Sequence, residues 1–370
     1  MKTLYGISIL AGTIIGAGLF SLPYITSVVG VKVMLGYILL LGSVSVLVHY
    51  FLGEIALKTP DFLRLPGFAK HHLGKNAQKI AYASGILGLL GAVLAYLILG
   101  GEFLTALFSP VFGGGTLQYT TIYFVVSSLF IYFGIKAISK VEFWGITVFL
   151  LVLFVTFYRG FSDISLENLF FMRPGEFDLF LPYGAILFAF CGLALIPEIE
   201  EMLSLGKERK KLLKIIPIGI VFSILTSLFF IFVVLGISGE NTTREGLVGL
   251  ERVMGGGVAS LMLVFGLLVI FTSIITIGLT VKKILWYDLK LPEKVSWAIA
   301  CFVPFFIFLL GVKDFIVVIG LVGATMIAID TILILLMYEK IKEKKVRLIT
   351  YPLIFIFVLG IIYEVVYFLR

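Results

Sequence analysis

The chain has 370 residues, of which 60% are hydrophobic and only 14% are charged, and its mean hydropathy is +1.14. Soluble domains average about 45–50% apolar and about 25% charged residues, because they must cover themselves with water-compatible side chains. This composition excludes a soluble enzyme, a nucleic-acid-binding domain and a disordered protein, and it leaves the net charge of +7 to be interpreted from its distribution.

Eleven apolar segments are long enough to cross a bilayer. About 30 Å of hydrocarbon requires a helix of about 20 mainly apolar residues. Helices are favoured because backbone groups in lipid must be satisfied internally, and the alternation of an outer-membrane barrel is absent. In chain order the segments are 4–29, 33–57, 79–109, 118–135, 141–158, 181–203, 214–237, 256–281, 294–311, 314–338 and 348–368. We predict an all-α, polytopic membrane protein whose first helix is retained rather than cleaved as a signal peptide.

The connections between these segments alternate between rich and poor in Lys and Arg. With the N-terminus in the cytoplasm, 22 of the 29 basic residues lie on the inner side and 7 on the outer side. Cytoplasmic loops carry such an excess. We therefore predict a multi-pass protein of the cell membrane with a cytoplasmic N-terminus and an extracytoplasmic C-terminus. The bilayer, and not a nucleic acid, is the partner that the positive charge indicates.

The segments divide into two sets of five and one further helix. Residues 1–158 hold the first set, 159–180 form an extracytoplasmic connection, 181–338 hold the second set, and 339–370 hold helix 11. Because five is odd, the second set enters the membrane with the opposite orientation, as in transporters built from inverted repeats. We expect a 5+5 inverted repeat plus one additional helix.

The first segment of each set carries glycine near mid-membrane and proline five to seven residues later. The two strings are Gly12-Thr-Ile-Ile-Gly16-Ala-Gly18-Leu-Phe20-Ser-Leu-Pro23 and Phe188-Ala-Phe190-Cys-Gly192-Leu-Ala-Leu-Ile-Pro197. Paired interruptions at corresponding positions indicate a transporter's binding site. Gly12 and Gly16 also match the Gly-x-x-x-Gly packing motif, an alternative that the first segment alone leaves open.

A helix broken at mid-membrane has a chemistry of its own. It exposes N–H groups where its second half begins and C=O groups where its first half ends. The N–H end suits a carboxylate, and the C=O end suits an ammonium group or a cation. Glycine allows a ligand to approach the backbone closely. Two such breaks in antiparallel spans would form a receptor for a zwitterion, so an amino acid is the predicted substrate.

The first string resembles the Gly-x-Ile-Ile-Gly-x-Gly-[Ile/Leu]-Phe-x-[Leu/Met]-Pro signature of the amino acid–polyamine–organocation superfamily. It is similar to both the aromatic amino acid permeases and the amino acid/auxin permeases. The second string, followed by Glu-Ile-Glu-Glu, resembles the unwound sixth helix of the same families. The resemblance implies the leucine-transporter-type fold and a mechanism of alternating access.

The resemblance also implies which residues bind substrate. Backbone amides at 16–18 would hold the carboxylate, carbonyls within 188–191 would take the amino group, and Phe190 would close over the side chain as a gate. The implied substrate-binding residues are Thr13, Gly16, Ala17, Gly18, Phe188, Ala189, Phe190, Cys191 and Gly192.

A coupling ion is the only non-substrate ligand expected, with no resident cofactor or metal. Thr272 and Ser273 resemble one half of the superfamily's sodium site, and the carbonyls of Gly12 and Ile15 would supply the other half. Ser and Thr in membrane helices also bond to the carbonyl one turn back, which is the alternative interpretation.

Proton coupling is the alternative to sodium. Carboxyl groups within membrane spans are functional candidates by default. Here Glu102, Glu198 and Asp330 are the candidates, and structural hydrogen bonding is their other interpretation.

Other functional classes fit the sequence less well. A channel would favour pore-lining polar helices or rings of charge. An enzyme would need a nucleophile with a base, paired acids or metal ligands, whereas the one histidine at membrane level is His49, near the inner end of 33–57. We predict a secondary active transporter of neutral or aromatic amino acids, with exchange or, more distantly, a non-transporting sensor or a channel as alternatives.

Overall fold

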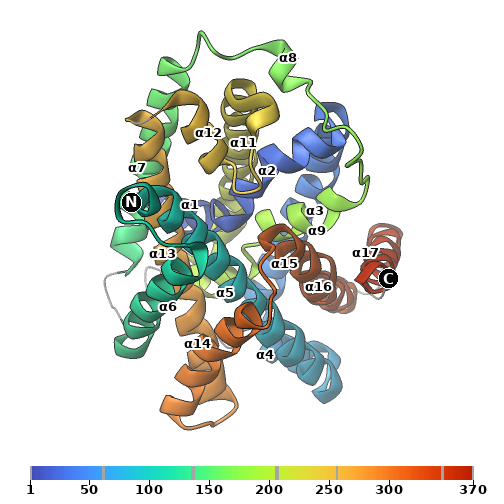
Figure 1. Ribbon diagram of the computed structural model, residues 1–370. Coiled ribbons are helices and arrows are strands. Elements are labelled where there is room, and N and C mark those ends of the chain that lie inside the picture. Colours follow the sequence, from blue (N-terminus) through green and yellow to red (C-terminus); the bar gives the residue numbers. More distant parts are fainter. Residues whose placement is uncertain are drawn as a thin grey trace.

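The computed structural model describes residues 2–60, 63–134, 138–204, 208–255, 257–342 and 346–368. These residues form a bundle of helices (Figure 1), and within them the only extended pairing is one isolated bridge between Thr243 and Gly246. The predicted all-α class is confirmed.

Two spans are broken near their middle. In the first, α1 (Lys2–Ile14) meets α2 (Ala17–Val29) at an angle of 52°. In the sixth, α9 (Leu181–Ala189) is followed by the 3₁₀ turn η1 (Leu193–Leu195) and by α10 (Ile196–Ser204).

The prolines of the two motifs lie differently with respect to the breaks. Pro23 lies inside α2, and Pro197 is the second residue of α10. Proline is tolerated in the first turn of a helix, where its missing N–H would have no partner. Glycine therefore marks both interruptions, whereas proline marks only the second, where Pro197 lies in the first turn after the break.

The other spans run through the bundle without such a sharp bend. Their helices are α3 (Val31–Lys58), α5 (Lys75–Phe112), α6 (Thr116–Phe133), α7 (Ile138–Arg159), α11 (Leu212–Ser238), α13 (Val258–Lys283), α14 (Glu293–Leu309), α15 (Phe315–Leu321) continued by the π-helical η5 (Val322–Ile327) and α16 (Ala328–Ile341), and α17 (Arg347–Phe368). The connections hold α4 (Leu65–Leu73), α8 (Leu166–Leu169), η2 (Arg209–Lys211), η3 (Gly239–Asn241), α12 (Leu247–Met254) and the π-helical η4 (Ile284–Asp288).

Length and composition mark seven of the described helices as membrane-crossing, or eight if α1 and α2 form one span. The remaining predicted segments contain helices that fall below these criteria in their described part: α9 and α10 have 9 residues each, α14 has 17, and the stretch of α7 whose side chains are described runs from Trp144 to Arg159. All eleven predicted segments contain helix. Residues 135 and 256, at the ends of two of them, lie outside the described residues.

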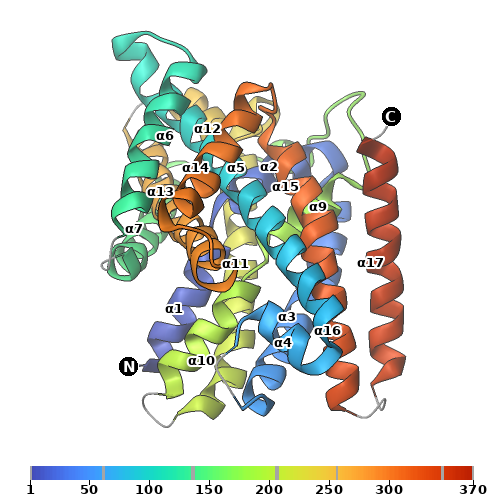
Figure 2. The same ribbon diagram turned by 90° about the horizontal axis from the view of Figure 1, so that it is seen from below.

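The bundle has two distinct ends. In Figure 2, α4, α10 and the start of α1 lie at one end, and α12 and the start of α15 lie at the other, with the two termini at opposite ends. We call the end with α4 and α10 the basic face, because its described residues include Arg64, Lys70, Arg209 and Lys211. Five basic residues counted for topology lie outside the described residues: Lys136, Lys207, Lys344, Lys345 and Arg370.

Helix α5 is the central element, in contact with α4, α6, α13, α14 and α15. Helix α1 packs on α11, α2 packs on α9 and α11, and α3 packs on α9, α11 and α16. By contrast α17 lies at the periphery against α16 (Figure 2) and exposes large apolar side chains such as Leu348 and Phe355. Exposed apolar helix faces are expected where lipid replaces water.

An aromatic cluster fixes α2 just beyond the first break. The Phe20 ring lies 5.2 Å from Phe103 of α5, 5.8 Å from Phe149 of α7 and 5.7 Å from Phe230 of α11, centroid to centroid. All three pairs are edge-to-face, the arrangement that the ring quadrupoles favour. Four spans thus meet at one residue of the predicted motif, which anchors the second half of the broken helix.

Candidate functional site

The first break is short and partly satisfied by its own backbone. The Gly16 amide donates to the Ile14 carbonyl at 2.8 Å, and the Leu19 amide donates to the Gly16 carbonyl at 3.1 Å. Ala17 and Gly18 occupy the first turn of α2, where N–H groups have no acceptor within the helix. Both residues are buried. The predicted carboxylate site therefore coincides with a buried helix N-terminus, contributed mainly by these two amides.

Neighbouring helices approach this break very closely. The Tyr96 hydroxyl of α5 occupies the space that a Cβ at Gly16 would need. A Cβ at Gly18 would lie 2.5 Å from the Cα of Ala189, at the end of α9. These glycines therefore serve packing as well as exposure of the backbone. The sequence analysis did not identify Tyr96. The one feature that could have pointed to it is a polar hydroxyl within the apolar segment 79–109.

The second break takes partners from α3. Helix α9 ends at Ala189, after which Ser45 Oγ donates to the Phe190 carbonyl at 2.8 Å. The Gly192 amide donates to Nε2 of His49 at 2.9 Å. Two orphaned backbone groups, one acceptor and one donor, are thus satisfied by side chains one turn apart on a single neighbouring helix.

These bonds define the protonation of His49. Nε2 carries no proton because it accepts from Gly192, and Nδ1 carries the proton because it lies 2.7 Å from the Ser45 carbonyl. The ring is only 3% exposed. The sequence located His49 at membrane level but did not predict this role, since its partner lies 143 residues away.

The two motifs are brought together. Gly18 faces Ala189, and a Cβ at Gly192 would lie 2.7 Å from Leu10 Cδ1 and 3.2 Å from the Ile14 side chain of α1. Two antiparallel breaks in contact are the arrangement that a zwitterion site requires.

Among the remaining predicted substrate residues, Thr13, Phe188 and Cys191 are half-buried. The Phe190 ring is 1% exposed and lies 3.9 Å from the Cβ position of Gly42 on α3. Phe190 therefore packs toward α3, and its action as a gate stays a prediction.

The predicted sodium residues lie on separate helices. Thr272 and Ser273 of α13 are buried, and both hydroxyls donate to the Val269 carbonyl, at 2.9 Å and 3.0 Å. Gly12 and Ile15 are buried at the end of α1, which packs mainly on α11, whereas α13 packs mainly on α5 and α7. Each hydroxyl oxygen keeps its acceptor lone pairs. Cation binding by this set stays a prediction.

The three candidate carboxyl groups lie in different surroundings. Asp330 of α16 accepts a hydrogen bond from Ser84 of α5 at 2.5 Å. Glu102 lines a cavity of about 270 Å³ together with Arg244 and Lys313. Glu198 lines a separate cavity at the basic face. The structure therefore does not gather these carboxyl groups into one proton path.

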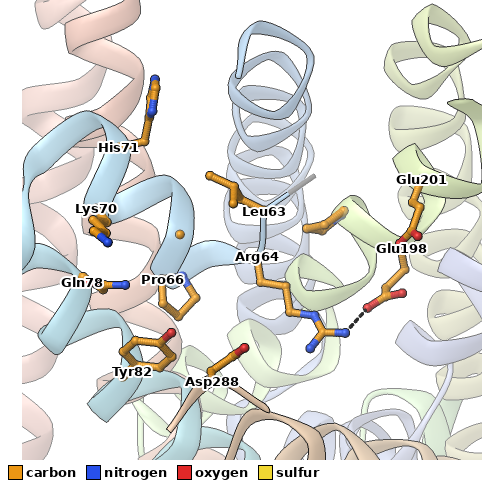
Figure 3. A pocket seen from close by; sticks show the side chains of 12 residues that line it. Leu63, Arg64, Pro66, Lys70, His71, Gln78, Tyr82, Glu198, Glu201 and Asp288 are labelled. Atoms are coloured by element: carbon orange, nitrogen blue, oxygen red, sulfur yellow. Dashed lines mark hydrogen bonds and ion pairs between the residues drawn. The ribbon is translucent and has the colours of Figure 1, made fainter. Parts of the chain in front are cut away.

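The cavity at the basic face has a volume of about 630 Å³ and lies between α4, α10 and the start of α5. At its wall Arg64 donates to Glu198 at 2.9 Å (Figure 3). Its lining residues are Leu63, Arg64, Pro66, Gly67, Lys70, His71, Gln78, Tyr82, Pro197, Glu198, Glu201 and Asp288. The cavity gives the basic face an opening next to the second half of the sixth span.

At the opposite face, two arginine side chains contact Tyr24 of α2. The Arg173 guanidinium lies 4.8 Å and that of Arg244 5.5 Å from the Tyr24 ring centroid. The Arg173 side chain also donates to Ser27 Oγ at 3.1 Å, and Arg244 pairs with Asp314. The connection after α7 is thereby held across the end of α2.

The sequence model of the tryptophan/tyrosine permease family matches residues 1–366, almost the whole chain. The chain belongs to this family. It is accordingly a multi-pass membrane protein of a transporter family and not an enzyme, as the sequence predicted.

Two relatives with assigned names are similar to a substantial part of the chain. Tyrosine-specific transport system 1 of Haemophilus influenzae is 25% identical over 347 residues, which cover 87% of this chain and 84% of that protein. Glutamine transporter 2 of Aliivibrio fischeri is 22% identical over 235 residues, which cover 62% of this chain and 59% of that protein.

Solved structures establish the fold of this permease. Mhp1, a nucleobase-cation-symport-1 family transporter in a closed conformation with bromovinylhydantoin bound, superposes with a TM-score of 0.64 at 14% identity, covering 90% of this chain and 77% of that one. MhsT in complex with L-phenylalanine gives a TM-score of 0.63 at 13% identity, covering 98% and 97%. The leucine-transporter-type fold predicted from the sequence is therefore confirmed, while the boundaries of the two repeats stay predictions.

Proposed function

We propose that this permease carries neutral amino acids, preferably aromatic ones, across the cell membrane by secondary active transport. The observation that carries the proposal is the contact between the two helix breaks, at Gly18 against Ala189 and at Gly192 against α1. An aromatic substrate is favoured by the family and by the relative named for tyrosine. The relative named for glutamine favours neutral amino acids more generally.

The two breaks would divide the zwitterion between them. The Ala17 and Gly18 amides, at the positive end of the α2 dipole, would bind the carboxylate. The ammonium group would bind carbonyls at the end of α9. Phe188 already accepts from the Cys191 amide at 3.2 Å, and the Phe190 carbonyl accepts from Ser45, so Ala189 and Cys191 are the better placed acceptors.

Transport would proceed by alternating access. We assign the basic face to the cytoplasm, which places the N-terminus inside and the C-terminus outside. The cavity of about 630 Å³ would then open inward, while Tyr24, Arg173 and Arg244 close the outer face. The return step would open that network and close the inner cavity.

Coupling to an inward gradient of Na⁺ or H⁺ would supply the driving force. The hydroxyls of Thr272 and Ser273, with the carbonyls of Gly12 and Ile15, form the sodium hypothesis. Hard oxygen ligands of this kind suit a small hard cation.

Uptake into proteoliposomes tests both parts of the proposal. Labelled tyrosine, tryptophan, phenylalanine and glutamine would be offered under an inward Na⁺ or an inward H⁺ gradient, each without the other. Sodium-driven uptake that is lost in Thr272→Ala supports the sodium site. Thr121→Ala is the matched control, because it removes the same kind of hydroxyl-to-carbonyl bond, 2.7 Å long, from an exposed site on α6. Absence of both driven uptake and counterflow for all four amino acids would contradict the proposed function.

A further inference from the structure

His49 connects α3 to the unwound part of the sixth span by bonds that depend on its protonation. Its ring has three neighbouring polar atoms: the Gly192 nitrogen at 2.9 Å, the Ser45 carbonyl oxygen at 2.7 Å and Ser45 Oγ at 3.3 Å. All three are uncharged. Neutral imidazole is both a donor and an acceptor, whereas imidazolium is a donor at both nitrogens.

The titratable groups on the elements that pack against α3 lie in contacts of their own. In the unwound segment and α16 they are Cys191, Asp330, Tyr338, Glu339 and Lys340, on α9 there is Tyr183, and on α3 and α10 they include Glu54 and Glu200. Glu339 pairs with Arg347. Asp330 accepts from Ser84, Glu54 pairs with Lys342 at 2.8 Å, and Glu200 pairs with Arg209. Lys214 of α11 and Tyr24 of α2 lie toward opposite ends of the bundle.

We propose that His49 is the proton-binding residue of the transport cycle, and that its protonation releases the second helix break from α3. The inference rests on the proposed function, because it assigns the coupling ion of the same site. Protonation at Nε2 would place an N–H against the Gly192 N–H, so that two donors face each other where one bond had been. The Nδ1–H bond to Ser45 would remain, and the only change in bonding is the gain and later loss of one proton at Nε2.

Breaking the hydrogen bond between His49 and Gly192 would also affect the first break, because the two breaks are in contact. Gly192 packs against Leu10 and Ile14, the last turns of α1, so a displaced Gly192 must move against the helix that precedes the substrate amides. Neutral His49, as observed, accompanies the state that is tied at the outer face and open at the basic face. In the cycle, Nε2 would take up a proton from the outer side when substrate binds there, carry it inward with the substrate and lose it toward the basic face, and the empty carrier would return with neutral His49, so that one proton crosses with each substrate molecule.

His49→Gln separates coupling from transport. The Gln carbonyl oxygen can accept from Gly192 but binds no proton at physiological pH. We expect counterflow of labelled substrate within about fivefold of wild type, because at most one hydrogen bond is weakened. Substrate-dependent H⁺ influx, followed with an internal pH dye, and accumulation driven by a pH gradient should both fall to the level of empty liposomes.

His71→Gln is the matched control, since His71 is exposed on α4 outside the spans and should retain both activities. His49→Gln protein that still accumulates substrate under a pH gradient would overturn the inference. Wild-type protein that shows no counterflow would instead contradict the proposed function, so the two failures are distinct.

A second measurement does not depend on transport or on the stability of the His49 variant. In a His71→Gln, His72→Gln background, ¹⁵N NMR of the remaining histidine reports the protonation of each ring nitrogen. We expect the Nδ1–H tautomer at high pH and a second proton at Nε2 as the pH falls. An Nε2–H tautomer at high pH, or a ring that never gains the second proton, would overturn the inference.

Discussion

The two broken spans satisfy their backbone groups in different ways. In the first, only residues 15–16 separate the helices, and the Gly16 amide is bonded to Ile14 within the same segment. In the second, residues 190–195 separate the helices, and side chains of α3 bond to Phe190 and Gly192. The first break therefore leaves the amides of the first turn of α2 in a geometry that its own backbone fixes. The second depends on a neighbouring helix, so a chemical change on that helix can alter it.

The largest expected effect comes from substitution where the breaks touch. Gly18→Ala places a Cβ 2.5 Å from the Cα of Ala189, and backbone cannot move aside as a flexible side chain can. Overpacking of this kind costs about 1–3 kcal/mol, and we expect the upper end of that range. Uptake should also be abolished, because α2 and its amides are pushed away from α9. Thermal unfolding followed by size-exclusion chromatography, together with proteoliposome uptake, measures the two effects.

Gly36→Ala provides the matched control for this prediction. Gly36 is exposed on α3, and nothing lies within 4 Å of the Cβ that an alanine would add. Alanine favours a helix over glycine by about 1 kcal/mol, so this variant should be at least as stable as wild type and fully active. Equal behaviour of the two variants would show that the contact between the breaks is not tight.

The position of the first break could be predicted because its determinants are local. Gly16 and Gly18 weaken the helix within a few residues of each other, and the break lies at residues 15–16. The positions of the apolar helices were predictable, and all eleven segments contain helix, because lipid imposes a length and a composition on every helix that crosses it. The count of eleven spans stays a prediction, since length and composition mark seven or eight of the described helices. Pro23 was less informative, since it lies inside α2, whereas Pro197 lies in the first turn of α10, directly after the second break.

The partners of the second break could not be predicted from the sequence. Ser45 and His49 read as two ordinary positions of an apolar segment, and their contacts lie 145 and 143 residues away. Tyr96 was missed for the same reason, because only the packing of α5 against the first break gives its hydroxyl a role. When a backbone group without a helical partner is hydrogen-bonded by a side chain far away in the sequence, neither residue shows a periodic pattern that would reveal the bond.

A smaller effect is expected where α3 supports the second break. Ser45→Ala leaves the Phe190 carbonyl without its hydroxyl donor, and a buried unsatisfied acceptor costs about 1–3 kcal/mol. We expect the lower half of this range, because the His49 bond to Gly192 remains. Ser43→Ala is the matched control, since exposed Ser43 donates only to the Leu39 carbonyl of its own helix. A melting temperature of Ser45→Ala equal to that of Ser43→Ala would show that the second break does not depend on α3.

The smallest effect is expected at the mouth of the basic-face cavity, beyond the second break. Arg64 and Glu198 form an ion pair at 2.9 Å, but their side chains are 39% and 47% exposed. Exposed pairs contribute about 0–1 kcal/mol, and salt screens them. In a double-mutant cycle of Arg64→Gln and Glu198→Gln, we expect a coupling energy below about 1 kcal/mol that shrinks at high ionic strength.

The Glu198→Gln variant also tests whether proton coupling takes place at the mouth of the basic-face cavity or at the second break. Glu198→Gln should retain uptake driven by a pH gradient within about fivefold, a change that corresponds to about 1 kcal/mol. The reason is that the carboxylate pairs with an arginine at the surface, whereas the His49 ring bonds to the backbone of the second break itself. Loss of driven uptake in Glu198→Gln with counterflow intact would reverse the assignment and place coupling at the cavity mouth.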